Sequence, residues 1–347
     1  MKLAGKMKLA GIALMSILIM MLAACGSKEE PNDTKAKSGE KPATKDEKIV
    51  VYTAGPKGLA EKIQAEFEKK SGIKVEQFQG TTGKILSRLE AEKNNPKADV
   101  VIVASWPSAV GMKKDGWTQA YADAKNADKL VPEWVDNEKH FFGYSASALG
   151  IVYNTDLVKT APKDWKDLTG ADWKDQVNFP DPTLSGSAVD FISGYLNDKG
   201  DEGWKLFEEI KKNGAYLAGA NAEALDPVVT GSKKAVIAGV DYMAYSAKEK
   251  GEAIDIIYPE SGTVINPRPA MILKDAPNVD GAKQFIDFLL SDEGQKLTTD
   301  AKLIPGRADI QADGRPGKDD IPLLKYDWKW MMEHGDEVTE KFMKIYK

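Results

Sequence analysis

Cysteine and histidine are almost absent from this sequence. Cys25 is the only cysteine in 347 residues, and His140 and His334 are the only histidines. A chain with one cysteine forms no internal disulfide, so its fold must be held together by its hydrophobic core. Two isolated histidines disfavour a metal centre or an imidazole-based catalytic triad. The sequence also lacks a nucleophile elbow, a phosphate-binding loop and a dinucleotide fingerprint, so we expect neither an enzyme nor a cofactor.

Arginine is scarce as well. Only four of the 48 basic residues are arginines, and the formal net charge is -5. An acidic surface rich in lysine argues against nucleic acid as a partner. A chain of this length is too long for one comfortable hydrophobic core, which indicates two domains.

The first 24 residues have the pattern of a secretory signal peptide. Three lysines precede an apolar run, Leu9–Leu22, that is too short to span a membrane, and small residues then lead to Cys25. This pattern resembles a bacterial lipoprotein signal, which implies removal of residues 1–24 and lipidation of Cys25. An ordinary signal peptide followed by an incidental cysteine is the alternative. Residues 25–47 are polar and charged, and we interpret them as a disordered tether.

The segment Ile49–Trp106 predicts strand, helix, strand, helix, strand. β-prone runs at 49–52, 73–78 and 98–103 alternate with helical spacings at 59–71 and 82–93. This alternation is typical of a parallel sheet, and ligands bind beyond the carboxyl ends of such strands. Small, hydroxyl-bearing and aromatic residues follow these ends, and we take six as candidate site residues: Gly55, Thr81, Thr82, Gly83, Ser105 and Trp106.

A second α/β module follows a long β-prone run, 141–153, that is long enough to pass between two domains. We expect this module to span residues 148–263, with residues 48–147 and 264–347 forming the first. A strand at 271–273 comes after Arg268 and its flanking prolines, and an amphipathic helix follows at 279–291. The tail, 321–347, predicts two helices, either part of the first lobe or shared between the two lobes. We expect their Trp and Met residues to pack as core.

Four segments carry a resemblance to a known family: 51–55, 71–75, 96–100 and 285–298, the last including Leu-Ser-Asp-Glu-Gly-Gln-Lys-Leu. They resemble the extracellular solute-binding proteins of ABC importers, in the branch that holds ferric-ion-binding and 2-aminoethylphosphonate-binding proteins. The resemblance implies a two-lobed α/β fold of type II, with a mainly parallel sheet flanked by helices in each lobe. It also implies a hinge crossed twice, a ligand between the lobes, an ABC permease as partner and a monomer.

The ferric-binding alternative is weakly supported. The resemblance implies adjacent tyrosines after the strand ending at Val240, but Asp241 and Tyr242 stand there. Neither His140 nor His334 lies in the loops that would supply the remaining ligands. Ferric ion prefers hard anionic oxygen ligands, and one phenol with one carboxylate is a small set.

An anion is the better-supported ligand. Ser185, Gly186 and Ser187 open a helix, where free N–H groups and two hydroxyls favour negative charge. A plain helix cap is the alternative for these residues. The resemblance further implies that the Ser-Gly pair holds an anion and that Asn221 supplies an amide beside it.

Other residues complete the candidate site. Arg268, between two prolines at the second crossing, suits a phosphate or phosphonate, although a surface arginine is the alternative. Asp241 is a candidate for a ligand amine or hydroxyl. Tyr242 and Trp106 are candidates for apolar walls or for packing between the lobes.

These observations predict a lipid-anchored binding protein on the extracellular face of the cell membrane, in a bacterium with one membrane. Its ligand would be a small organophosphorus anion such as an aminoalkylphosphonate or a phosphorylated metabolite. Ferric binding and ligand sensing for a membrane kinase remain the alternatives.

Overall fold

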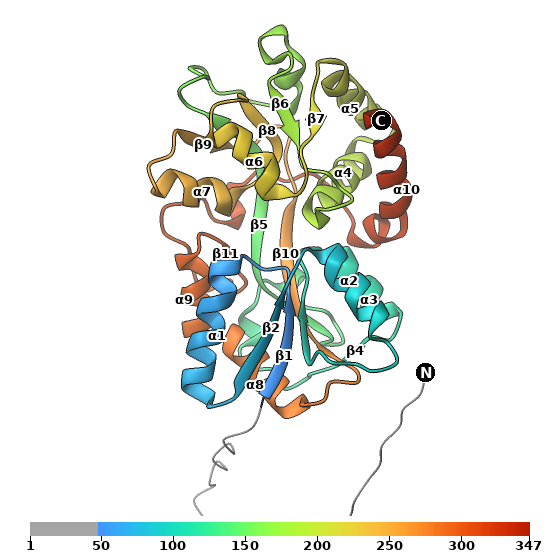
Figure 1. Cartoon of the computed structure of the whole chain (residues 1–347), viewed down its shortest axis with the longest axis vertical. Coiled ribbons are helices and arrows are strands. Elements are labelled where there is room, and N and C mark those ends of the chain that lie inside the picture. Colours follow the sequence, from blue (N-terminus) through green and yellow to red (C-terminus); the bar gives the residue numbers. More distant parts are fainter. Residues whose placement is uncertain (1–47) are drawn as a thin grey trace, which may run out of the picture. The chain divides into compact units, whose positions relative to one another are not determined.

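The computed structural model describes residues 48–347 (Figure 1). The predicted signal peptide, the predicted lipidation site at Cys25 and the predicted tether lie outside these residues. Among residues 48–347, no helix is both long and apolar enough to cross a membrane.

The first α/β region has the predicted order of elements. Strand β1 pairs in parallel with β2 on one side and with β3 on the other. Glycine ends helix α1, since Gly72 has a φ of 78° that suits a residue without a side chain. The elements of this region are β1 (Lys48–Thr53), α1 (Lys57–Ser71), β2 (Lys74–Gln79), α2 (Thr82–Ala91), β3 (Val100–Ile102), α3 (Trp106–Lys114) and β4 (Thr118–Gln119).

Two long strands, β5 (Phe141–Asn154) and β10 (Ile265–Leu273), connect the two lobes and pair antiparallel with each other (Figure 1). Near one end, β10 also pairs with β3 and β4. Near the other end of the pair, β5 continues to β8 and β9. The sheet order β2-β1-β3-β10-β5-β8-β6-β7 therefore runs through both lobes. The long run at 141–153 passes between them as predicted.

The second α/β region packs helices around β8 and β6, which are parallel. β6 is also parallel to β7, so both lobes are mainly parallel away from the connecting strands. The elements are β6 (Val177–Phe179), α4 (Gly186–Lys199), α5 (Glu202–Lys212), β7 (Tyr216–Leu217), α6 (Asn221–Val229), β8 (Ala235–Val240), α7 (Asp241–Glu249) and β9 (Ile254–Ile257).

Two sequence predictions were wrong in detail. β10 begins at Ile265, so Arg268 and both flanking prolines lie inside the strand and not before it. The prolines are tolerated because this half of β10 forms its ladder with β5 alone, and the register shifts between Arg268 and Pro269. The tail holds one α-helix, α10 (Trp328–Tyr346), where two were expected.

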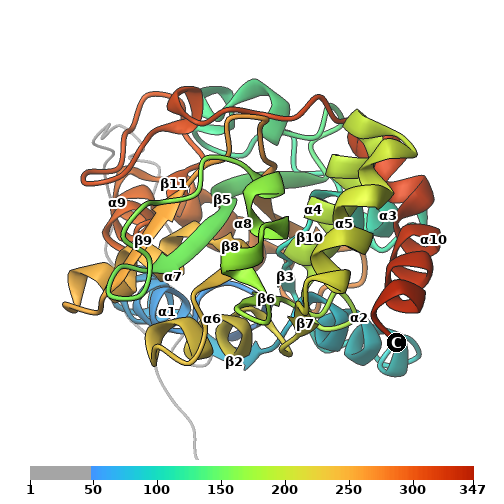
Figure 2. The ribbon, with the colours of Figure 1, turned by 90° about the horizontal axis from the view of Figure 1, so that it is seen from above.

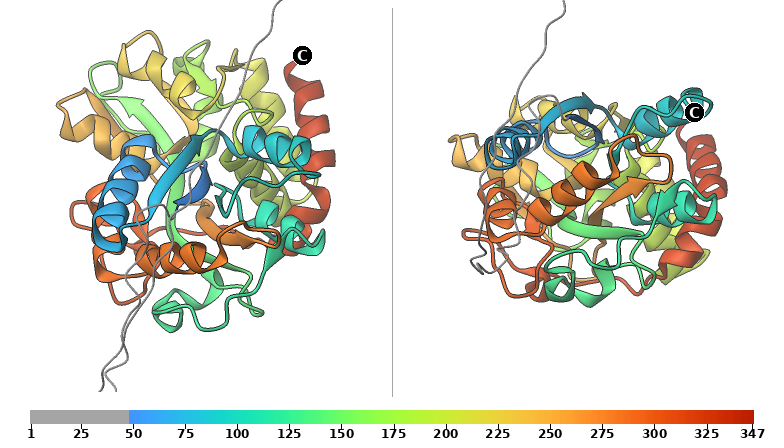
Figure 3. Two further views of the ribbon diagram at one scale, coloured as in Figure 1. Left: turned by 60° about the horizontal axis from the view of Figure 1, so that its bottom comes forward. Right: turned by 90° about the horizontal axis from the view of Figure 1, so that it is seen from below.

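The remaining helices cover the sheet. α8 (Val279–Leu289) and α9 (Asp292–Asp300) pack with α1 on the first lobe (Figure 3). α10 contacts α4 and α5 of the second lobe and also α3 of the first (Figure 2). A short strand, β11 (Ile304–Pro305), adds to β5, and 3₁₀ turns lie at Ala127–Lys129, Pro132–Trp134, Trp165–Thr169, Ala171–Trp173 and Lys318–Asp320.

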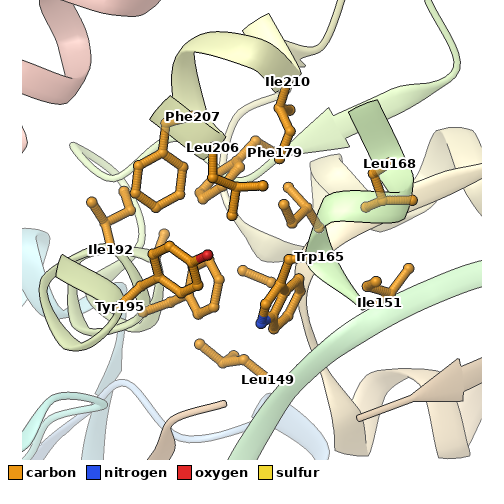
Figure 4. Packing of buried hydrophobic residues seen from close by; sticks show 14 of the residues in the cluster. Leu149, Ile151, Trp165, Leu168, Phe179, Ile192, Tyr195, Leu206, Phe207 and Ile210 are labelled. Carbon is orange, nitrogen blue, oxygen red and sulfur yellow. The ribbon is translucent and has the colours of Figure 1, made fainter. Parts of the chain in front are cut away.

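The core of the second lobe is rich in aromatic rings (Figure 4). Phe179 lies 6.1 Å from Phe207 and 5.1 Å from Phe342 between ring centroids, and Trp165 lies 4.6 Å from Phe191. The Trp165 indole N–H donates to the carbonyl of Gly262 at 2.9 Å, which satisfies its one polar atom. Trp165 is therefore a core residue.

Candidate functional site

The N-terminus of α4 brings together four of the predicted site residues, Ser185, Gly186, Ser187 and Asn221. Ser185 caps the helix by accepting from the Ala188 N–H at 3.2 Å. Its hydroxyl lies 2.8 Å from Asn221 Oδ1, and the Asn221 amide donates to Ser187 Oγ at 3.0 Å. The Ser185 and Ser187 hydroxyls are 3.1 Å apart. The first N–H groups of an α-helix have no partner within it, so the N–H groups of Gly186 and Ser187 make no hydrogen bond within α4.

Gly186 places this cluster against the first lobe. A Cβ built on Gly186 would lie 3.3 Å from Thr82 Oγ1 and 3.5 Å from Ser105 Cβ. Thr82 Oγ1 itself accepts from the Ala104 N–H at 3.0 Å. The absence of a side chain at Gly186 therefore lets the loop before α4 approach the loops before α2 and α3.

The start of α2 holds the other predicted threonine and glycine. Thr81 caps α2 by accepting from the Lys84 N–H at 3.4 Å. Gly83 is exposed, and a Cβ on it would lie 3.9 Å from the carbonyl of Thr183 in the other lobe. Gly83 therefore lies at the edge of the contact between the lobes.

Ser105 makes a direct hydrogen bond across this contact. It donates to Asp190 Oδ1 on α4 at 2.9 Å and caps α3 by accepting from the Ser108 N–H. Asp190 is 1% exposed, and within residues 48–347 its Oδ2 has no hydrogen-bond partner. Burial raises the pKa of this carboxyl well above its ordinary value, and the hydrogen bond from Ser105 opposes that rise.

The connecting strands contribute a polar face beside the same helix end. Asn266 and Arg268 alternate on β10 opposite Ser147 and Ser145 on β5. Arg268 donates from Nη1 to Ser147 Oγ at 2.9 Å, and the Asn266 amide lies 3.5 Å from the carbonyl of Ser187. The predicted arginine is thus buried in a strand and is not a surface residue.

Three buried polar atoms on this face lack a partner in the described part of the chain: Arg268 Nε, Ser145 Oγ and Asn266 Oδ1. Buried polar groups in proteins are almost always hydrogen-bonded, and a group without a protein partner commonly meets a water or a ligand. We call the set Thr82, Ser105, Ser145, Ser147, Ser185, Gly186, Ser187, Asn221, Asn266 and Arg268 the polar junction.

Tyr242 and Tyr144 lie beside the junction arginine. The Arg268 guanidinium carbon is 5.2 Å from the centroid of the Tyr242 ring. Burial raises the pKa of both phenols, and the charge of Arg268 partly offsets that rise. A Cβ on Gly55 would lie 3.3 Å from the Tyr144 hydroxyl, which places this predicted glycine against Tyr144.

The structure gives Asp241 a different role from the one predicted. Its Oδ2 accepts from Arg315 at 2.5 Å, from the Ala148 N–H at 2.9 Å and from the Tyr258 hydroxyl at 3.1 Å. Its Oδ1 accepts from the Tyr242 N–H at 2.7 Å. Both carboxylate oxygens are engaged and the side chain is fully buried, so Asp241 is not available to a ligand amine in this arrangement.

The ring of Trp106 packs in an apolar cluster and not among the side chains of the polar junction. Its ring packs edge to face on Phe141 at 4.9 Å between centroids and lies 6.4 Å from Trp328. The residue is buried in a cluster of apolar side chains. Trp106 and Tyr242 were both predicted as aromatic walls of the site. Trp106 is instead accounted for by packing in the apolar cluster, whereas Tyr242 lies beside Arg268.

Binding of a metal ion is the alternative function, and the described residues offer no cluster of common metal ligands for it. Within residues 48–347, no three His, Cys, Asp or Glu side chains are grouped to hold an ion. His140 pairs with Thr118 at 2.8 Å, and His334 stacks on Trp330 at 4.3 Å between ring centroids. The engagement of Asp241 by Arg315 removes one of the two ligands that the sequence offered for ferric ion.

Sequence reasoning missed the polar face of the strands and Asp190. The signal was present in the long strand, where Ser145 and Ser147 recur at every second residue within an apolar run. Asp190 is likewise the one charged residue in the mostly apolar segment 188–196. A polar residue on a buried face is more informative than an apolar one, because its burial needs a partner.

Comparison with known proteins agrees with this architecture. Residues 95–334 match the model of the bacterial extracellular solute-binding protein family. A putative 2-aminoethylphosphonate-binding periplasmic protein of Salmonella paratyphi A is 26% identical over 70% of this chain and 73% of its own length. The major ferric iron-binding protein of Neisseria meningitidis is also 26% identical, over 72% of this chain and 78% of its own length.

Solved structures show the same fold. The periplasmic binding protein AfuA from Actinobacillus pleuropneumoniae, with fructose-6-phosphate bound, superimposes with a TM-score of 0.79 at 24% identity, covering 86% of this chain and 98% of its own. Iron-bound HitA from Pseudomonas aeruginosa gives 0.76 at 22% identity, covering 85% and 99%. The family match extends over most of the chain and the fold is that of a two-lobed binding protein. This chain therefore belongs to the bacterial extracellular solute-binding proteins, whose members deliver a small solute to an ABC permease.

Proposed function

We propose that this chain captures a small phosphate ester or phosphonate at the polar junction and delivers it to an ABC permease. The observation that carries the proposal is the meeting of a helix N-terminus, a hydroxyl cluster and a buried arginine at one contact between lobes. Ser185, Ser187 and Asn221 surround the start of α4, and Asn266 connects this helix end to the face that holds Arg268.

The chemistry of these groups suits a tetrahedral anion. The positive end of a helix dipole and free N–H groups favour negative charge, and a guanidinium binds phosphate oxygens through two donors. Arg268 has a buried Nε without a partner in residues 48–347, so it has donor capacity left for such an anion. A bound anion would also neutralise the charge of the Arg268 guanidinium, which is otherwise buried away from water.

The rest of the ligand is less constrained. The amine of an aminoalkylphosphonate was predicted to meet Asp241, but that carboxylate is taken by Arg315. We therefore commit to the phosphate or phosphonate group and not to an amine. The names of the relatives are consistent with this choice, since one is described as a phosphonate-binding protein and AfuA was solved with a sugar phosphate.

Thermal-shift screening tests the proposal. A ligand that binds only the folded state raises the melting temperature, so phosphate esters or phosphonates should raise it in proportion to ligand concentration. The proposal fails if these anions leave the melting temperature unchanged while another class of solute raises it. Ferric citrate belongs in the same screen, because ferric binding is the alternative that two of the relatives' names suggest.

Other parts of the account are proposals as well. Lipidation of Cys25 predicts that a Cys25→Ala variant is released from the membrane fraction. The two lobes would divide at residues 147/148 and 263/264, and the chain would act as a monomer without catalysing turnover of its ligand. A gene deletion that abolishes ligand-induced transcription but leaves uptake intact would favour the sensing role over transport.

A further inference from the structure

A cavity of about 910 Å³ lies between helices α2 and α3 on one side and α4 and α10 on the other. Its size is at the upper end of the range of small-molecule sites in proteins. Much of its lining is apolar and polarisable, with Met112, Trp117, Met331 and Met332 contributing from α3, the loop after it and α10. Thioethers and an indole adapt readily to ligands of varied shape.

The charged residues of this lining all carry the same sign. Four carboxyl groups line the cavity, and none of its lining residues is a lysine, arginine or histidine. Glu90 pairs with Lys93, at 3.3 Å, whereas Asp115 and Asp336 make no ion pair in the part of the chain that the structure describes. The fourth carboxyl group is that of Asp190. A cavity with these walls attracts cations and repels anions.

Asp190 distinguishes this cavity from an ordinary acidic surface. The side chain lines the cavity, is 1% exposed and receives one hydrogen bond, from Ser105 to Oδ1. Its Oδ2 has no partner among residues 48–347. A buried carboxylate oxygen without a partner is costly, and a cation bound beside it would remove that cost.

We propose that this cavity is a second ligand site, which takes an organic cation with an apolar body and pairs its ammonium group with Asp190. The apolar body would lie against Trp117 and the methionines of α3 and α10, where indole and thioether groups favour an aromatic or alkyl chain. The site is separate from the anion site, since its charge is opposite and its lining shares only Ser105 with the polar junction.

Isothermal titration of the purified chain tests this proposal with three probes of similar shape. 4-Phenylbutylamine carries the cation, 4-phenylbutanol replaces it with a neutral group and 4-phenylbutyrate with an anion. The amine should bind at least tenfold more tightly than the alcohol, and the acid should not bind. Equal binding of amine and alcohol, or binding of the acid, would overturn the proposal.

Two variants locate the binding. Asp190→Asn keeps an acceptor for Ser105 but removes the charge, and it should weaken amine binding at least tenfold. Asp198→Asn is the matched control, because Asp198 lies on the same helix, pairs with Lys199 and is outside the cavity. Unchanged amine affinity in Asp190→Asn, or an equal loss in the control, contradicts the proposal.

A third variant covers the case in which Asp190→Asn does not fold. A Cβ on Gly335 of α10 meets only Val189 Cγ1, at 3.7 Å, and Gly335 lines the cavity. Gly335→Leu therefore fills the cavity while improving the helix propensity of α10. It should abolish amine binding, and retained binding would show that the amine lies elsewhere and overturn the proposal.

Discussion

Asp241 and Arg315 form a fully buried ion pair, with 2.5 Å between Oδ2 and Nη2 and neither side chain exposed. Arg315 comes from the segment after β11, and Asp241 opens helix α7. The guanidinium also lies over the ring of Tyr245 at 5.3 Å. This pair fastens the returning chain to the second lobe, and it explains why an aspartate that follows a buried strand need not be a ligand-binding residue.

Removing one partner of this pair should destabilise the protein strongly. Arg315→Met leaves the Asp241 carboxylate buried without its cation, which costs about 3–5 kcal/mol in comparable sites. The double variant Arg315→Met with Asp241→Leu should recover part of that loss, since no charge is left unpaired. Urea denaturation measures both. A direct ligand-binding role for Asp241 would instead show as lost affinity in Asp241→Asn with unchanged stability.

Ser187→Ala should weaken anion binding with little effect on folding. Its hydroxyl accepts from Asn221 but does not cap α4, because Ser185 does. Loss of one hydrogen bond to a charged ligand is worth about 1.5–3 kcal/mol, or about a 10- to 150-fold weaker affinity. Titration calorimetry with the anion found by screening measures the effect. An unchanged affinity would mean that this cluster is only a helix cap.

Arg268→Met separates binding from stability. The buried guanidinium makes one hydrogen bond, to Ser147, and its Nε has no partner in residues 48–347. Replacing it by an apolar side chain of similar length should leave the unliganded melting temperature equal or higher. Anion affinity should fall by at least about 30-fold, since about 2 kcal/mol or more is lost with a buried charged partner. A lower melting temperature with normal affinity would mark Arg268 as structural.

Gly186→Ala should oppose the approach of the two lobes. The added methyl group would lie 3.3 Å from Thr82 Oγ1, and overpacking of this kind costs about 1–3 kcal/mol. Because separation of the lobes relieves the overlap, we expect weaker anion binding with nearly normal stability. Gly58→Ala is the control, since nothing lies within 4 Å of its Cβ. Equal affinities in the two variants would show that Gly186 does not determine the approach.

The stability of the protein should depend on pH through Asp190. Burial raises the folded-state pKa of this carboxyl well above the ordinary value of 3.8. Below pH 3.8 the carboxyl is protonated in both the folded and unfolded states, so its burial does not reduce the free energy of unfolding. As pH rises further, the unfolded state ionises first, so the folded state loses relative stability until its own pKa is reached.

Asp190→Asn removes this loss and keeps the acceptor for Ser105. The variant should therefore exceed the parent protein in stability at neutral pH, with the difference shrinking toward about pH 4. Urea denaturation of both proteins across this pH range measures the difference in their free energies of unfolding. The other titrating groups contribute equally to both proteins and cancel in this difference. A constant difference, or one that grows at low pH, would contradict the assignment.

Much of the fold was predictable because it is local. The alternation of strands and helices in 49–106, the length of the strand at 141–153 and the cap at Ser185 follow from periodicity, length and capping preferences. The position of Arg268 inside a strand could not be predicted, because prolines flank it on both sides. The half of β10 that contains Arg268 tolerates proline because it pairs with β5 alone. That pairing depends on the tertiary structure and not on the local sequence.

The site was predictable only in part, for the same reason. Ser185, Ser187 and Asn221 were predicted and do lie together, although their binding role remains a prediction. The partner of Asp241 is Arg315, which is 74 residues away along the chain, and no local pattern connects them. The bond between Ser105 and Asp190 likewise spans 85 residues and two lobes.

Native mass spectrometry of the gently purified chain tests the central claim most directly. The account predicts a bound small molecule that contains a phosphate or phosphonate group and that is absent from both Ser187→Ala and Arg268→Met. A co-purified ligand without phosphorus, or one retained at full occupancy by both variants, would contradict it.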